Sequence, residues 1–309
     1  MAGHEDSTSH IVQSLFVNVA IAIIKGIAAV LTRSGSMLAE ALHSAADCGN
    51  QILLLMGVRS SKRPPDAEHP LGYGRDVYFW SFMVALLLFS GGGVFSIYEG
   101  IHKIHEPEKV ERVWLGMLIL GISIVLEGAS LASNIREINR RRGGKPFMKY
   151  LHDTKDSDLI VVFGENAAAV LGLFFALIAL VLADKTGDGR WDGIGSVVIG
   201  VVLVGVAVFL AREVKSLLLG ESADAEIAEA ARKIAAEHPN LERVLHLVTI
   251  QQGPGEVLVS IKVAFTSGLV IDDVCRSINE FEAKLRAARP EVRWLYVEPD
   301  IPRDRVEAA

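Results

Sequence analysis

Cysteine is scarce in this chain of 309 residues, which contains only Cys48 and Cys275. Cys48 lies in an apolar stretch and Cys275 in the polar C-terminal third, so the two form no CxxC pair. A disulfide framework is therefore not expected. A site without thiolate ligands also disfavours Cu(I).

Other familiar signatures are missing as well. The formal net charge of −6 gives no reason to expect nucleic acid as a partner. No P-loop of the form GxxxxGK(S/T) is present to suggest a nucleotide-driven pump, and no HExxH to suggest a zinc hydrolase. The first ten residues, MAGHEDSTSH, have no basic n-region, so we expect no cleavable signal peptide.

Long apolar runs, by contrast, are abundant. Half of the residues are hydrophobic (50%) and the mean hydropathy is +0.35, yet 22% of the residues are charged. That mixture predicts two unlike parts. About 20 apolar residues cross a bilayer, and six stretches of suitable length predict a membrane α-helical protein with six transmembrane helices: Ile11–Thr32, Ser36–Val58, Val77–Ile101, Val113–Ile135, Ser157–Ala183 and Gly193–Leu210.

Basic residues cluster after the second, fourth and sixth of these spans, for example in the run from Arg136 to Lys155. By the positive-inside rule, both termini are cytoplasmic. We expect a multi-pass protein of a prokaryotic inner (cell) membrane, with residues 1–217 forming the transmembrane transport domain.

Residues 218–309 have the pattern of a small soluble domain. Apolar residues recur at helical spacing in Asp224–Glu237 and Asp272–Ala288. Strands are predicted at Leu241–Gln251, Glu256–Phe265 and Val292–Val297, and Gly253-Pro254-Gly255 predicts a turn between the first two. This order fits a two-layer α+β domain with helices on one face of the sheet.

The second span carries the most informative polar residues. His43 and Asp47 are four residues apart, so on a helix they lie on one face, one turn from each other. An ionisable pair at membrane depth usually faces a cavity or an ion path. Imidazole and carboxylate together suit a divalent transition metal such as zinc. The plainer alternative is a buried pair that only holds two helices together.

These features together resemble the cation diffusion facilitator family over nearly the whole chain. The most specific motifs are SGSMLAEALHSAADCGNQ from Ser34, EHPLGYGR from Glu68 and WDGIGSVVIG from Trp191. HxxxD in the second span is similar to the branch that includes the mitochondrial zinc carriers. The resemblance implies a homodimer that exchanges Zn²⁺ or a related divalent ion for protons, a cytoplasmic ferredoxin-like C-terminal domain, and His43 and Asp47 as metal ligands.

In the fifth span the chain departs from the family pattern of a His and an Asp four residues apart. Only Glu165 and Asn166 are available there, and the positions one turn earlier are Val161 and Val162. We favour Glu165 as the third ligand, because a carboxylate binds a divalent cation better than an amide does. Asn166 is a fourth ligand or an outer donor, and otherwise water completes the tetrahedron. The alternative is that both residues only mediate a helix contact.

Two further sites are weaker candidates. Asp66 and His69 match two positions of a family site in a loop, but Tyr73 replaces its other histidine. His246 matches one family ligand in the C-terminal domain, whereas Lys262 and Val297 stand where others would be. We therefore expect solvated Asp66 and His69 side chains and an ordinary half-buried His246.

The proposed chemistry follows from the ligands. Metal binds only deprotonated imidazole and carboxylate, so loading releases protons and protonation expels the metal. Because imidazole titrates near neutrality, His43 is a candidate exchanger. No prosthetic group is expected, and Zn²⁺ is favoured as cargo over Mn²⁺, Co²⁺ or Fe²⁺. Two alternatives remain: a transport-inactive metal sensor or scaffold of the same fold, and an intramembrane metalloenzyme.

Overall fold

The computed structural model describes residues 5–302, apart from the side chains of residues 5–14, 16, 17 and 158. The chain divides into two compact units. The first contains the residues up to Arg59 together with Tyr78–Lys215, and the second contains Ser60–Val77 together with the residues from Ser216 onward. The sequence-based division at residue 217 stays a prediction.

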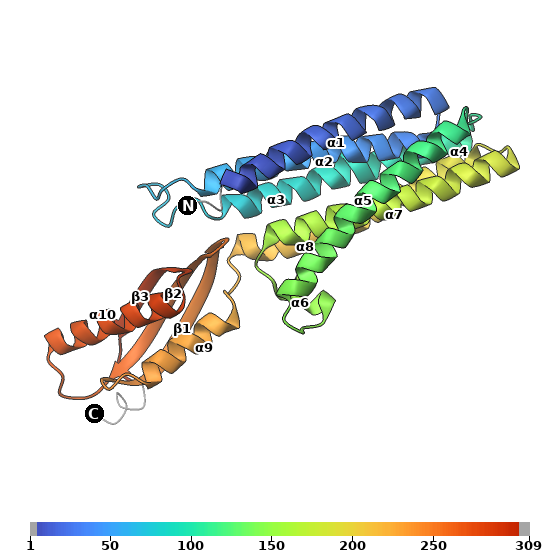
Figure 1. Cartoon of the computed structure of the whole chain (residues 1–309). Coiled ribbons are helices and arrows are strands. Elements are labelled where there is room, and N and C mark those ends of the chain that lie inside the picture. The colour runs from blue at the N-terminus through green and yellow to red at the C-terminus, as the bar shows by residue number, and fades with distance from the viewer. Residues whose placement is uncertain (1–4, 303–309) are drawn as a thin grey trace. The chain divides into compact units, whose positions relative to one another are not determined.

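Long helices build the first unit (Figure 1). The chain turns sharply between the first two helices, where Arg33 has a φ of 51° and the Met37 N–H donates to the Ser34 side chain across 3.1 Å. A short helix, α6, was not predicted in the basic run after the fourth span. The helices are α1 (Glu5–Thr32), α2 (Gly35–Ser61), α3 (Asp76–Leu87), the π-helical turn η1 (Leu88–Val94), α4 (Phe95–His105), α5 (Val113–Arg141), α6 (Phe147–Asp153), α7 (Ser157–Thr186) and α8 (Arg190–Leu219).

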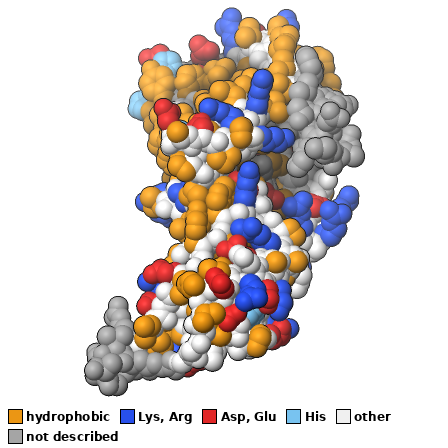
Figure 2. Space-filling model, turned by 90° about the vertical axis from the view of Figure 1, so that its left-hand side faces the viewer, with side chains coloured by type: hydrophobic (Ala, Val, Ile, Leu, Met, Phe, Trp, Pro, Cys, Tyr) orange, Lys and Arg blue, Asp and Glu red, His pale blue; other side chains and the backbone are white. Residues whose placement is uncertain are grey.

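Four of these helical segments are long and apolar enough to cross a membrane: Asp76–His105, Val113–Arg141, Leu159–Thr186 and Arg190–Leu219. A shorter apolar helix covers Asn18–Thr32. The polar residues of α2 lower its hydropathy, although the helix is 27 residues long. Large hydrophobic side chains such as Val30, Trp114 and Val125 are exposed, and Figure 2 shows hydrophobic side chains gathered on the surface. Exposed apolar area of this extent marks an interaction surface, here the lipid.

Glycines let two helical segments approach each other closely. A Cβ atom added to Gly200 of α8 would lie 2.7 Å from the Gly93 carbonyl oxygen and 2.8 Å from the Ile97 nitrogen. A Cβ on Gly100 would lie 2.6 Å from the Gly193 carbonyl oxygen. Backbone therefore packs on backbone along η1, α4 and α8, as small residues allow in membranes.

The second unit has the predicted order of helices and strands: α9 (Ala225–Ala236), β1 (Leu241–Gly253), β2 (Glu256–Phe265), α10 (Ile271–Ala288) and β3 (Val292–Pro299). The sheet order is β1-β2-β3, antiparallel between β1 and β2 and parallel between β2 and β3. The predicted turn brings β1 into β2, with Gly255 at a φ of +68°.

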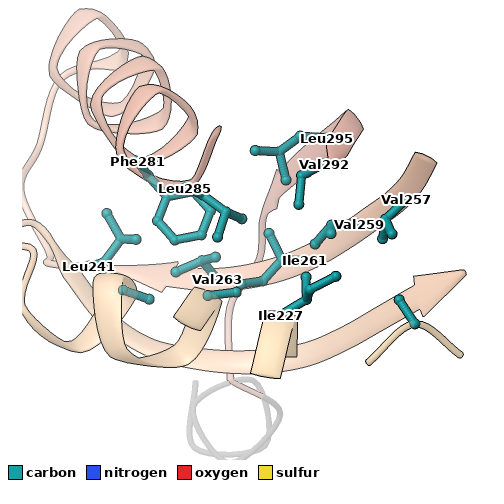
Figure 3. Close-up of a cluster of buried hydrophobic side chains, with 13 residues drawn as sticks. Ile227, Leu241, Val257, Val259, Ile261, Val263, Phe281, Leu285, Val292 and Leu295 are labelled. Atoms are coloured by element: carbon teal, nitrogen blue, oxygen red, sulfur yellow. The ribbon is translucent and has the colours of Figure 1, made fainter. Parts of the chain in front are cut away.

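One apolar core holds this sheet and its helices together. Alternate residues of β2 are fully buried, as a strand with one covered face requires, and they meet side chains from both helices. Figure 3 shows Phe281 and Leu285 of α10 and Ile227 of α9 pointing toward Ile261 and Val263 of β2. The helices therefore cover one face of the sheet, as the alternation predicted.

The segment between α2 and α3 also belongs to the second unit. A Cβ on Gly74 would lie 2.7 Å from the Gln252 carbonyl oxygen, and one on Gly253 would lie 2.8 Å from the Gly74 Cα. The loop that follows the second predicted span therefore packs closely on the end of β1.

Gly200→Ala tests the close packing of α8. A Cβ at this position must push the backbone of η1 and α4 away, which costs about 1–3 kcal/mol for overpacking. We expect a lower Tm for the full-length protein in detergent. Gly205→Ala is the matched control on the same helix, since nothing lies within 4 Å of its added Cβ. It should keep or raise the Tm, because Ala favours a helix by about 1 kcal/mol over Gly.

Candidate metal centre

The polar face of α2 is formed as its spacing predicted. The Nδ1 atom of His43 lies 3.7 Å from Oδ1 of Asp47, and the His43 side chain is fully buried. Among the described residues, neither imidazole nitrogen has a hydrogen-bond partner, and Asp47 Oδ1 has none either. Buried polar atoms are nearly always paired in folded proteins. Atoms left open in this way, on an imidazole and a carboxylate, are suited to holding a metal ion.

A second polar contact joins α2 to α7. The Asn50 side-chain amide donates to Glu165 Oε1 across 2.6 Å. Asn50 is fully buried and lies one turn beyond Asp47 on α2. The amide holds Oε1 of Glu165 in place. This contact of Asn50 was not predicted from the sequence.

Asp47, Glu165 and Asn166 line one cavity of about 320 Å³. His43 is not among the lining residues and lies beside Asp47. Among the side chains that the structure describes, no group of three or more His, Cys, Asp or Glu residues lies close enough to hold a metal ion together. Three predicted ligands, Asp47, Glu165 and Asn166, thus line one cavity, and the fourth, His43, lies beside it. The four side chains do not form a coordination shell.

Helix α5 contributes a carboxylate that was not predicted from the sequence. Glu127 of α5 lines the same cavity, together with Ser130, Ser133 and Asn134 of that helix. These four residues recur at helical spacing, and Glu127 is an isolated acid in an otherwise apolar stretch. That isolation was the signal by which Glu127 could have been found.

The cavity runs lengthwise along α2 and α5. Its lining residues extend from Ser44 to Leu54 on α2 and from Glu127 to Asn134 on α5. On α7 they lie near the beginning of the helix, at Val162, Glu165 and Asn166. The cavity therefore extends from Asp47 toward the ends of α2 and α5 that carry the basic residues.

At the opposite end of α2, a buried aspartate ties several helices together. Asp192 of α8 accepts hydrogen bonds from the Ser34 hydroxyl (2.7 Å), the Gly35 N–H and the Ser36 N–H (3.1 Å). The Lys103 ammonium of α4 lies 3.6 Å from the same carboxylate. A carboxylate at a helix N-terminus satisfies N–H groups that have no partner within the helix. This end of the unit is closed by polar contacts.

The predicted loop residues Asp66 and His69 form a turn. Asp66 Oδ1 accepts the backbone N–H groups of Glu68 (3.0 Å) and His69 (2.8 Å), and its Oδ2 accepts the Tyr73 hydroxyl (2.7 Å). The Arg63 guanidinium lies 3.9 Å from the centre of the Tyr73 ring. The Tyr73 hydroxyl lowers the pKa of the Asp66 carboxyl most, followed by the backbone N–H of His69. The carboxylate is thus engaged in local structure.

His246 lies on the side of β1 that faces away from the core, and it is exposed. The prediction of a half-buried histidine was therefore wrong, because the helices cover only the other face of the sheet. His246 pairs across the strands with Lys262, whose ammonium lies 2.8 Å from Glu298 Oε1 and 3.5 Å from Asp300 Oδ2.

These helices and this cavity define a multi-pass integral membrane protein with a polar cavity in its helical unit. The cation efflux transmembrane domain matches residues 11–219. The chain therefore belongs to the cation efflux family, the cation diffusion facilitators, as its motifs predicted. The family consists of transporters and not of enzymes.

Similar proteins include the mitochondrial proton-coupled zinc antiporter SLC30A9 of Xenopus laevis, 34% identical over 80% of this chain and 44% of that protein. The human SLC30A9 protein is 32% identical with the same coverage. Metal tolerance protein C4 of Arabidopsis thaliana is 29% identical over 80% of this chain and 54% of that protein. The chain thus spans about half the length of these relatives.

Among solved structures, a MamM C-terminal domain is similar to part of the chain. The match has 10% identity and a TM-score of 0.24, and it covers 25% of this chain and 98% of that one.

Tyr73→Phe tests the role of the loop carboxylate. Losing the hydroxyl removes the largest cause of the lowered pKa, so the Asp66 pKa should rise toward its ordinary value of 3.8. Because a lowered pKa stabilises the fold above that value and the benefit disappears as pH falls, the variant should lose part of this contribution at neutral pH. Carboxyl ¹³C shifts of labelled protein give the pKa. His69→Ala is the control and should move it far less, since it keeps the backbone N–H.

Proposed function

We propose that the chain is a secondary active transporter that exports a divalent transition metal, Zn²⁺ first among the candidates, in exchange for protons. The observation that carries this proposal is the shared cavity: carboxylates from α2 and α7 line it, and His43 lies beside one of them. Membership of a transporter family supports it, as do relatives named as zinc antiporters.

The proposal includes six transmembrane segments: α1, α2, the run from α3 to α4, α5, α7 and α8. It assigns residues 1–217 to transport and residues 218–309 to a cytoplasmic ferredoxin-like domain. Two copies form a homodimer, and a prokaryotic inner membrane is the proposed location. Basic residues at the ends of α2 and α5 support cytoplasmic termini. With that orientation, the cavity extends from Asp47 toward the cytoplasm.

The proposed cycle begins with this inward-extending cavity. Glu127, Asp47 and Glu165 attract the cation, and His43 with Asp47, Glu165 and Asn166 or water then surround it after small side-chain movements. Binding requires deprotonated ligands, so protons leave as the metal enters. For release, the helical unit rearranges to open the other end, where the Asp192 contacts must separate. Protons then displace the metal.

The transport-inactive sensor is the second candidate. One observation supports it: among the described side chains, no three His, Cys, Asp or Glu residues lie close enough to hold a metal ion together. A sensor would bind metal without moving it across the bilayer, so a transport assay separates the two functions.

His43→Ala and Asp47→Ala test the proposed site. Each removes a ligand, and we expect metal-driven proton movement in proteoliposomes to fall to the background of empty vesicles. A stopped-flow assay across Zn²⁺, Mn²⁺, Co²⁺ and Fe²⁺ under a pH gradient also gives the selectivity. Asp66→Ala, in the loop, is the control and should keep transport. Wild-type rates in both α2 variants would remove this site from the mechanism.

Asn50→Leu tests how Glu165 is positioned. The change keeps the approximate volume but removes the amide that holds Glu165 Oε1. Loss of such an outer contact typically lowers metal affinity by about 10–100-fold. Titration of the purified protein with Zn²⁺ against a chelating dye gives the affinity. Ser133→Ala, elsewhere on the cavity wall, should change it little, and an unchanged affinity in Asn50→Leu would deny the amide this role.

A further inference from the structure

One buried cation has no part in the proposed cycle. Lys25 of α1 is 1% exposed, and its ammonium donates to the Ser44 hydroxyl across 2.9 Å. It also lies 3.4 Å from Oε2 of Glu40, which is 0% exposed. A charge is removed from water at high cost unless it is paired and hydrogen-bonded. α2 therefore provides this ammonium with a carboxylate and a hydroxyl.

The oxygens around Lys25 have the composition of a cation site. Glu40 and Ser44 are one turn apart on α2, so they lie on one face. Glu40 Oε1 has no hydrogen-bond partner among the described residues, and it faces Gly172 of α7, where an added Cβ would contact it. The carboxylate therefore uses one oxygen for Lys25 and keeps another open.

This cluster is next to the proposed metal centre. Glu40 precedes His43 by three residues, which places the two side chains about 5–6 Å apart at their Cβ atoms. Ser44 contacts Lys25 and also lines the cavity shared by Asp47 and Glu165. The cluster thus adjoins the cavity at the closed side of Asp47.

We propose that Glu40 and Ser44 form a second cation subsite, which the Lys25 ammonium occupies permanently. Asp47, Glu165 and Glu127 offer their carboxylates to the transported ion from the cavity, whereas Lys25 balances the charge of Glu40. The lysine thereby limits this region to one divalent ion and keeps the added carboxylate from retaining it. This inference rests on the proposed function, since it presupposes a metal at His43 and Asp47.

Variants that remove one or both charges test the subsite, and the readout is Zn²⁺ binding to full-length protein in detergent. Glu40→Gln leaves the Lys25 ammonium unbalanced near the proposed metal centre. Because this ammonium repels the metal cation, the Zn²⁺ affinity should fall at least about tenfold. Lys25→Met/Glu40→Gln removes both charges and should restore the affinity. Because breaking a buried ion pair also destabilises the fold, the titration uses protein that the Tm shows to be folded. A pair that only stabilises the helices would leave the Zn²⁺ affinity of folded Glu40→Gln at the wild-type value.

The number of bound ions is the second readout. Lys25→Met frees the Glu40 carboxylate, so the variant should bind one more Zn²⁺ per protomer than the wild type at saturation. Lys25→Arg is the matched control and should keep the wild-type number, and Lys25→Met/Glu40→Gln should lose the extra ion. Where Lys25→Met does not purify as a folded species, the affinity of Glu40→Gln decides.

Two outcomes overturn the subsite: wild-type affinity in Glu40→Gln, or an unchanged ion count in folded Lys25→Met. Asp47→Ala distinguishes these from failure of the proposed function. If wild-type protein binds Zn²⁺ and Asp47→Ala loses that binding, the metal centre stands and only the subsite fails. If Asp47→Ala binds Zn²⁺ as the wild type does, the metal centre itself is wrong.

Discussion

The helical unit depends on finding partners for its buried polar side chains, and one such contact is the hydrogen bond between Asn50 and Glu165. It connects the two helices that carry the proposed ligands, and it does so where water is scarce. In such surroundings a polar side chain must find a partner within the protein or an ion to bind. The same constraint explains the pairing of Lys25 with Glu40 and of Asp192 with Lys103. The polar residues of the apolar spans are thus used in three separate places.

The polar regions of the helical unit differ in how completely their polar atoms are paired. The contacts of Asp192 are complete, with N–H and O–H donors and an ammonium on its carboxylate. Around His43 and Asp47, by contrast, several polar atoms have no partner among the described residues. Complete networks specify one arrangement, whereas incomplete ones leave room for a ligand. The difference supports the proposed metal centre at His43 and Asp47 independently of any motif.

Much of this architecture could be predicted from the chain. Long apolar runs predicted the long helices. The alternation of apolar and more polar residues predicted the strand β2, in which Val259 and Ile261 are buried. The spacing of His43 and Asp47 predicted their contact, because neighbours on one helix are fixed by local geometry. The sequence likewise favoured Glu165 as a third ligand, and the structure places it on the same cavity as Asp47.

The missed features depend on packing between helices. Glu127 is separated from Asp47 by a long stretch of chain, and no local pattern says which face of α5 meets α2. The role of Asn50 and the exposure of His246 were missed for the same reason, since each depends on which neighbour covers which face. The π-helical turn at Leu88–Val94 was not predicted either.

The segment Ser60–Val77 belongs to the same compact unit as the sheet, and its Gly74 packs on the end of β1. This segment directly continues α2, the helix of His43 and Asp47. The chain consequently passes between the two units three times, after Arg59, Val77 and Lys215. The helix of His43 and Asp47 therefore runs directly into the second unit, with no linker between them.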